Sequence, residues 1–70
     1  MTQSYTAVVK QDGDWWIGWI AEIPAVNCQE TTRDGLLESL RTTLGEALEQ
    51  NHRDAVSAAG PDYQEEVIVL

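Results

Sequence analysis

The sequence predicts a single α+β domain over residues 1–70, with an antiparallel sheet covered on one face by one amphipathic helix. Three observations support this fold class. Two strand-like runs flank an Asp-Gly dipeptide, leucines repeat at helical spacing in the middle, and an aliphatic run closes the chain. The predicted order is β-β-β-α-β. A chain of 70 residues has room for one domain with a thin core.

The N-terminal part is predicted to form a hairpin and a short third strand. Residues 5–10 (YTAVVK) are dominated by β-branched and aromatic residues, which are typical of a strand. Asp12-Gly13 is expected to form a two-residue type I′ turn, in which both positions need positive φ. The second strand, residues 15–23, is expected to stop at Pro24, which cannot donate to a ladder, and residues 26–30 form the third.

One amphipathic helix is predicted to follow the third strand. Thr32 is the expected N-cap, and Asp34 in the first turn complements the positive end of the helix. Apolar residues then recur at spacings of three and four, which gives one apolar stripe. The residues of the stripe expected to form the core face are Leu36, Leu40, Leu44 and Leu48.

The last part of the chain is predicted to be a loop and a strand. Residues 57–62 (SAAGPD) contain the Gly60-Pro61 dipeptide, which marks a loop. Residues 65–70 (EEVIVL) are predicted to form a terminal strand.

The hairpin is predicted to be apolar on both faces. With Asp12-Gly13 as the loop, paired residues have numbers that sum to 25, so that Val9 lies opposite Trp16 and Ala7 opposite Gly18. The first face carries Tyr5, Ala7, Val9, Trp16, Gly18 and Ile20. The second carries Thr6, Val8, Lys10, Trp15, Ile17, Trp19 and Ala21. The small residues of the first face would admit a closely packed helix, so the helix is assigned there.

The second face is the candidate partner surface. One helix covers only one side of a sheet, which leaves Trp15, Ile17 and Trp19 for another chain. Tryptophan anchors are typical of interface hot spots. The alternative is that these side chains only fill the core or shield a sheet edge. The chain is expected to self-associate as a homodimer or a larger oligomer, because a thin core is often supplemented in this way.

Charge and cysteine content limit the partners and the compartment. Four basic and twelve acidic residues give a formal net charge of −8, so direct nucleic-acid binding is not expected and a basic protein partner is favoured. The single cysteine excludes an internal disulfide and fits a reducing compartment. No run of 18 apolar residues and no signal-peptide pattern occur, which predicts a cytoplasmic protein without membrane contact.

No catalytic residue, cofactor or metal is expected. Cys28 and His52 are the candidates for a nucleophile and its base. No feature activates the Cys28 thiol, because Cys28 lies at no predicted helix start and has no Lys or Arg adjacent in sequence. Cys28 is expected to be a half-buried strand residue, and His52 to cap the helix end or face solvent. The carboxylates considered for a divalent cation are expected to form a solvated face; they are Glu22, Glu30, Asp34 and Glu38.

The ordered motifs resemble the HicB family of antitoxins. That family has an aromatic near the start of the first strand, a second strand of the form W-I-G-W, an acidic-x-Pro step, a short strand and a helix opening with T-x-x-E-A/L-L. The matching positions are Tyr5, residues 16–19, residues 22–24, residues 26–30 and residues 32–40. The resemblance covers residues 5–50.

The resemblance implies a partly RNase H-like α+β domain of the HicB type. It implies a non-catalytic antitoxin that binds and neutralises a HicA toxin, a small basic RNA-cleaving protein. The negative charge of this chain suits such a partner. An alternative is an orphan, self-associating structural or regulatory domain with no toxin. A degenerate nuclease rests on topology alone, which is a poor basis for assigning activity.

The sequence departs from the family pattern in two places. Gly35 stands where the family often has glutamate, which removes the reciprocal half of a capping box on Thr32. Many members carry a C-terminal DNA-binding segment, whereas this chain is expected to end at Leu70 in a strand. Operator binding is therefore not carried over.

Overall fold

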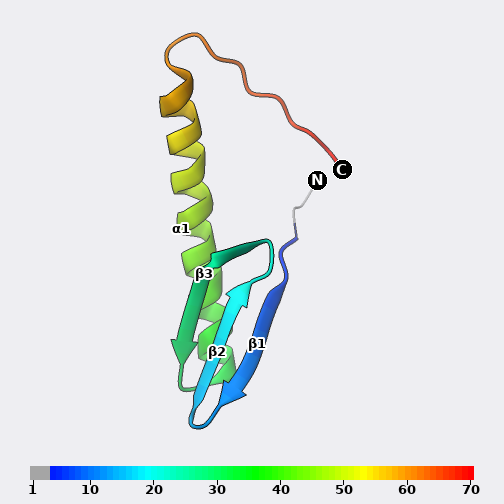
Figure 1. The fold of residues 1–70 in the computed structure, drawn as a ribbon, viewed down its shortest axis with the longest axis vertical. Coiled ribbons are helices and arrows are strands. Elements are labelled where there is room, and N and C mark those ends of the chain that lie inside the picture. The colour runs from blue at the N-terminus through cyan, green and yellow to red at the C-terminus, as the bar shows by residue number, and fades with distance from the viewer. Residues whose placement is uncertain (1–3) are drawn as a thin grey trace.

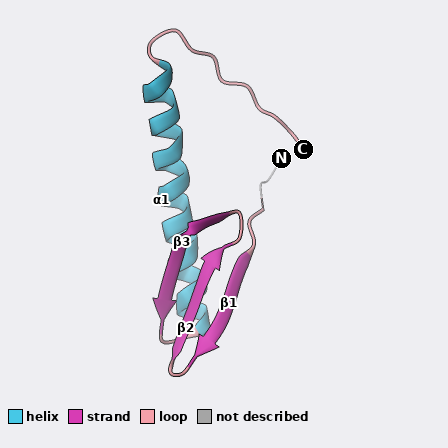
Figure 2. Ribbon diagram, viewed as in Figure 1, coloured by secondary structure: helices cyan, strands magenta, loops and turns pink. Residues whose placement is uncertain are grey.

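Three antiparallel strands followed by one long helix make up the computed structural model, which describes residues 4–70 (Figures 1 and 2). The elements are β1 (Ala7–Asp12), β2 (Trp15–Ile20), β3 (Ile23–Glu30) and α1 (Arg33–Ala59). The sheet order is β1-β2-β3, so β2 is the central strand. This confirms the predicted α+β class. The molecule is elongated, with extents of 51 × 23 × 15 Å.

The first hairpin forms as predicted, but its turn lies one residue later. Asp12 pairs with Trp15, which leaves Gly13-Asp14 as the loop. Gly13 has a φ of 61°, and no non-glycine residue of the described chain, 4–70, has a positive φ. This pattern matches a type II′ turn, which needs positive φ only at its first central position. The predicted Asp12-Gly13 turn and the pairing that it implied are therefore wrong.

The turn error does not change the predicted faces of the sheet. Val9 pairs with Gly18 and Ala7 with Ile20, so the register differs from the predicted one by two residues. Side chains alternate between faces with a period of two. A shift of two residues therefore keeps every side chain on its predicted face, whereas a shift of one would have exchanged the two faces.

The third strand is longer than predicted, and Pro24 lies within it. β3 starts at Ile23, three residues before the predicted start, and its register to β2 shifts between Trp19 and Ile20. Proline is tolerated on edge strands and at irregular positions, because its missing N–H then costs no ladder bond. β3 is an edge strand, so Pro24 did not mark a boundary.

The helix begins where the sequence predicts. Thr32 has extended backbone geometry, and its hydroxyl accepts a hydrogen bond from the Gly35 N–H at 3.0 Å. The Leu36 N–H donates to the Thr32 carbonyl at 3.0 Å. Thr32 thus satisfies one of the N–H groups that the first helical turn leaves unpaired. The helix ends at Gly60, whose φ of 80° suits glycine.

The core lies between the first half of α1 and the sheet. Its fully buried members are Ile20, Val26, Leu36 and Leu40. Packed around them are the partly buried Tyr5, Val9, Trp16, Ile23, Cys28, Leu44 and Ala47. Leu48, also placed on the core face by its spacing, is half-buried. The helix therefore covers the sheet face that carries Val9, Trp16 and Ile20.

The predicted terminal strand is wrong. None of residues 61–70 belongs to a strand, and Val67 and Ile68 are 90% and 82% exposed. The helix continues twelve residues past Ala47, a rise of about 18 Å. The chain therefore leaves α1 well away from the sheet, and its last residues project beside the molecule (Figure 1).

Candidate protein-interaction surface

The ladder register shows which residues lie on the sheet face opposite α1, which we call the outer face. In the row Val8–Trp19–Asn27 and the row Lys10–Ile17–Gln29, residues of all three strands lie side by side. Their neighbours in sequence point to the helix, so these side chains point away from it. Trp15, Ile17 and Trp19 thus form an apolar column along β2, the middle of the outer face.

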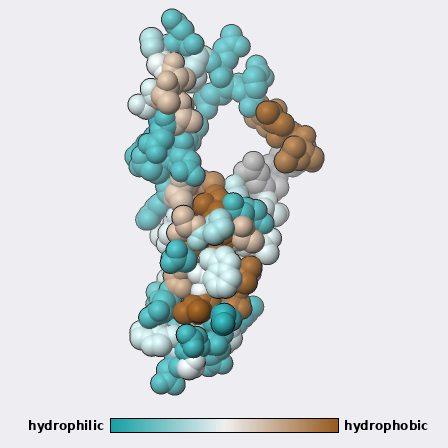
Figure 3. Space-filling model, in the orientation of Figure 1, coloured by the Kyte–Doolittle hydropathy of each residue, from teal (hydrophilic) through white to brown (hydrophobic). Residues whose placement is uncertain are grey.

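Nothing else in residues 4–70 covers the outer face, which is turned toward the viewer in Figures 1 and 3. Trp15 is 46% exposed and Val8 37% exposed, whereas Ile17 and Trp19 are half-buried between their cross-strand neighbours. Lys10, an exposed residue, stands at the margin. An apolar centre with a polar margin is the usual anatomy of a protein–protein interface.

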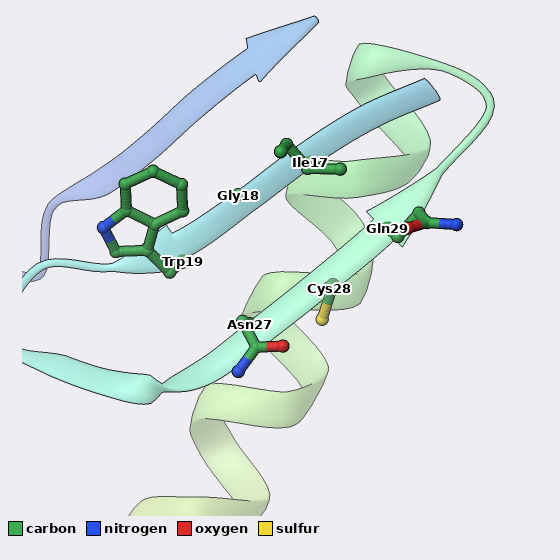
Figure 4. Close-up of a pocket in the computed structure, with 6 residues that line it drawn as sticks. All are labelled: Ile17, Gly18, Trp19, Asn27, Cys28 and Gln29. Carbon is green, nitrogen blue, oxygen red and sulfur yellow. The ribbon is translucent and has the colours of Figure 1, made fainter. Parts of the chain in front are cut away.

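A shallow groove of about 380 Å³ crosses the outer face between β2 and β3 (Figure 4). Gly18 and Cys28 are paired across the two strands, and their side positions face the helix. Only their backbone is therefore exposed on the outer face, where it forms the floor of the groove. The groove is lined by Ile17, Gly18, Trp19, Asn27, Cys28 and Gln29. The pleat of the sheet therefore creates the groove between two rows of outward side chains.

The groove has one apolar side and one amide side. Ile17 and Trp19 of β2 border it on one side, and Asn27 and Gln29 of β3 on the other (Figure 4). The Asn27 amide nitrogen donates to the Ala25 carbonyl at 3.0 Å, which fixes the orientation of that side chain. Such a groove is suited to an apolar side chain whose neighbouring peptide groups bond to the amides.

Carboxylates lie at both ends of the first hairpin. Residues 4–32 contain one lysine and four carboxylates, of which Asp12 precedes the first turn and Asp14 lies within it, next to Trp15. The Glu22 carboxylate accepts a hydrogen bond of 2.7 Å from the Thr6 backbone N–H. This bond, supported by the Thr6 side chain, lowers the pKa of Glu22 below its ordinary value. The hydrogen bond thus stabilises the ionised form of the carboxylate.

The structure does not bring Cys28 and His52 together. Cys28 faces α1, with its sulfur 3.5 Å from the Thr43 hydroxyl. His52 follows Thr43 by nine residues, about 14 Å of helical rise, and is paired with Glu65 of the C-terminal segment. Cys28 thus links β3 to the helix, and His52 links the C-terminal segment to the helix.

The four carboxylates that are candidates for a divalent-cation site, Glu22, Glu30, Asp34 and Glu38, are spread over a turn, β3 and α1. Glu30 accepts a hydrogen bond from the Ser39 hydroxyl at 2.7 Å, and Glu22 lies beyond the other end of β2. Within residues 4–70, no three His, Cys, Asp or Glu side chains gather closely enough to hold a metal ion. Over the same residues, no helix combines the length and the apolar character needed to cross a membrane.

The comparisons with known proteins return no match: no family model, curated protein or solved structure is significantly similar to this chain.

Sequence reasoning placed the β2 column on the outer face but missed the β3 contribution. Asn27 and Gln29 alternate with Val26, Cys28 and Glu30, and this polar alternation was the available signal. Without the register between β2 and β3, the sequence did not show that the two amides lie beside Trp19 and Ile17.

Proposed function

We propose that this chain is a non-catalytic, cytoplasmic protein-interaction domain of the HicB type, which binds and neutralises a small basic HicA-type RNA-cleaving toxin. The observation that carries the proposal is the uncovered outer face with its column of Trp15, Ile17 and Trp19. Two indoles and an isoleucine on one open sheet face are the kind of patch that marks an interaction site.

Charge supports the proposal that the partner is basic. The chain has a net charge of −8, and the acidic residues Asp12 and Asp14 lie next to Trp15. Opposite charges steer two proteins together and speed their association. The motifs of residues 5–50 resemble those of HicB antitoxins, and this resemblance indicates a HicA-type toxin as the basic partner.

A second candidate is an orphan domain that self-associates through the outer face and has no toxin. The same apolar column favours it, because a patch of this kind also serves contact between two copies of one chain. The neighbouring reading frame discriminates the two candidates. A short basic frame next to this gene favours the antitoxin, and its absence favours the orphan domain.

The proposal is tested by expressing the product of an adjacent basic reading frame and titrating it with this protein. We expect stoichiometric binding that weakens with salt, and inhibition of the RNA cleavage by the toxin. This protein alone is expected to cleave neither RNA nor DNA, with or without Mg²⁺ or Mn²⁺. Binding that is absent at low salt would contradict the proposal.

Trp19→Ala tests whether the outer face makes the contact. Removing an interface anchor costs about 2 kcal/mol or more, a loss of over tenfold in affinity. Tyr63→Ala is the matched control, because Tyr63 is an aromatic residue, 44% exposed, that lies beyond the helix. Equal affinity of the Trp19→Ala variant and the wild type would place the toxin site elsewhere.

A further inference from the structure

The outward edge of β1 presents unpaired backbone groups. β1 is an edge strand that pairs with β2 alone in the described sheet. The Thr6 carbonyl accepts a hydrogen bond of 2.8 Å from the Ala21 N–H, so position 6 bonds toward β2. Orientation alternates along a strand, so the N–H and C=O groups of Ala7, Val9 and Gln11 face outward. These three residues form a ready template for another strand.

The C-terminal segment Val67–Leu70, called the tail below, has the chemistry of a strand without a partner. Its residues are 90%, 82%, 60% and 116% exposed in chain order. All four are aliphatic and three are β-branched, a composition favoured in strands. The tail projects free of the sheet and the helix and forms the brown group at the C-terminal end in Figure 3.

The β3 edge carries more features that discourage strand addition than the β1 edge. β3 carries Pro24 and an irregular register next to Ile20, two features that discourage strand addition. β1 contains no proline, and its only charged residue before the terminal Asp12 is Lys10. The edge formed by Ala7, Val9 and Gln11 is therefore the better acceptor for a further strand.

The tail does not lie along β1 of its own chain. The helix carries the chain about 18 Å past Ala47, and the hydrogen bond between the His52 ring and the Glu65 carboxylate holds the returning segment to the helix. The tail ends away from the β1 strand of its own chain (Figure 1).

The molecule is less compact than a typical chain of its mass, because α1 and the segment after it extend past the sheet. The molecule exposes 5731 Å², about 1,300 Å² more than the roughly 4,400 Å² typical of a compact protein of its mass. Its radius of gyration is 15.2 Å, against about 11 Å for a compact chain of this length.

We propose that two copies exchange their tails, so that Val67–Leu70 of each chain adds as a fourth strand to the β1 edge of the other. The exchange is reciprocal and therefore gives a closed two-fold dimer. It uses the edge of the sheet and leaves Trp15, Ile17 and Trp19 on the outer face. It consequently does not depend on the proposed toxin.

The first experiment blocks each half of the contact separately. Ile68→Pro combined with Val69→Pro removes two consecutive N–H groups, one of which must face β1; Ile68→Thr with Val69→Thr is the matched control. Gln11→Pro removes an outward N–H at an exposed position of β1, with Gln11→Thr as its control. Light scattering should give twice the chain mass of 7.8 kDa for the wild type and both controls, and 7.8 kDa for both proline variants.

The second experiment mixes the two proline variants. The edge variant keeps an intact tail and the tail variant keeps an intact edge, so the mixture should form a heterodimer by one exchange. Circular dichroism verifies that each variant is folded before mixing. A monomeric wild type, a mixture that stays monomeric, or a dimer that persists in both proline variants would overturn the proposal.

Discussion

Gly18 lies where the central strand crosses the helix, and the space around it has no room for a side chain. A Cβ at this position would lie 2.8 Å from the Val8 carbonyl oxygen and 3.1 Å from the Leu36 Cδ2. The sequence predicted that the small residues Ala7 and Gly18 admit the helix; Leu36 packs over Gly18, whereas Ala7 is exposed. What the sequence did not show was that the closest atom belongs to the backbone of β1.

Gly18→Ala is expected to destabilise the domain by about 1–3 kcal/mol, the usual cost of overpacking a core. The Val8 oxygen belongs to the sheet backbone and cannot move aside cheaply. Gly45→Ala is the matched control, because nothing lies within 4 Å of its Cβ position in α1. That variant should gain about 0.5–1 kcal/mol from lower backbone entropy. Urea unfolding of both variants gives the comparison, and equal stabilities would contradict it.

Glu22 links the β2–β3 turn to the start of β1 through its hydrogen bond from the Thr6 N–H. This bond lowers the pKa of Glu22 in the folded chain below its ordinary value of 4.5. A lowered folded pKa gives stability that is fully present above 4.5 and is lost as the pH falls through the folded pKa. The unfolding midpoint of the wild type should therefore fall more steeply below pH 4.5 than that of Glu22→Gln.

The corresponding spectroscopic measurement is direct. In an NMR titration, the Glu22 carboxyl should titrate below the ordinary glutamate range, together with a shift of the Thr6 amide proton. A Glu22 carboxyl that titrates at its ordinary value would show that the Thr6 contact does not persist in solution.

The elements show which local signals suffice and which need tertiary information. The hairpin strands, the N-cap and the helical stripe were predicted from patterns that span a few residues. The turn position was not, because Asp12-Gly13 and Gly13-Asp14 both place Gly13 inside a two-residue loop. The difference depends on which pairs pack best across the sheet, and Val9 opposite Gly18 is one such pair.

The start of α1 gives a prediction at the element scale. Thr32→Ala removes the hydroxyl that accepts the Gly35 N–H and should cost about 1 kcal/mol. Gly35 provides no side chain that could compensate, so the loss should appear in full. Thr32→Ser is expected to keep most of the stability, and Thr31→Ala serves as the neighbouring control. Thermal unfolding followed at 222 nm checks the order; a Thr31→Ala cost equal to that of Thr32→Ala would contradict the N-cap assignment.

The tail shows why a strand-like sequence is not sufficient for a strand. Val67, Ile68 and Val69 have high β-propensity, yet a strand needs an edge within reach. The length of α1 decides the path of the chain, and the helix continues to Ala59, well past the core. The leucine stripe ends before that point, so the sequence pattern gave no warning of the overhang.

At the scale of the whole molecule, one face of the sheet makes the fold and the other is available for a partner. Only part of the candidate site could be predicted from the sequence. Side chains alternate along β2, which places Trp15, Ile17 and Trp19 on one face. The positions of Asn27 and Gln29 beside them depended on the register between β2 and β3. The core contacts and the proposed partner contacts therefore lie on opposite faces of a single strand. Substitutions on the two faces should separate the two properties.

Trp19→Ala and Leu40→Ala test this separation. Leu40 is 1% exposed and joins α1 to the sheet, so its truncation leaves a cavity that costs about 2–5 kcal/mol. Stability of that order is a large part of what so small a domain has. Leu40→Ala should therefore lose most of its helical circular dichroism. Trp19→Ala removes a half-buried side chain of the outer face and should keep its helix while binding its partner over tenfold more weakly. Sedimentation measures association, and circular dichroism measures helix content. A Trp19→Ala protein that unfolds but binds normally when folded would show that Trp19 belongs to the core face and not to the outer face.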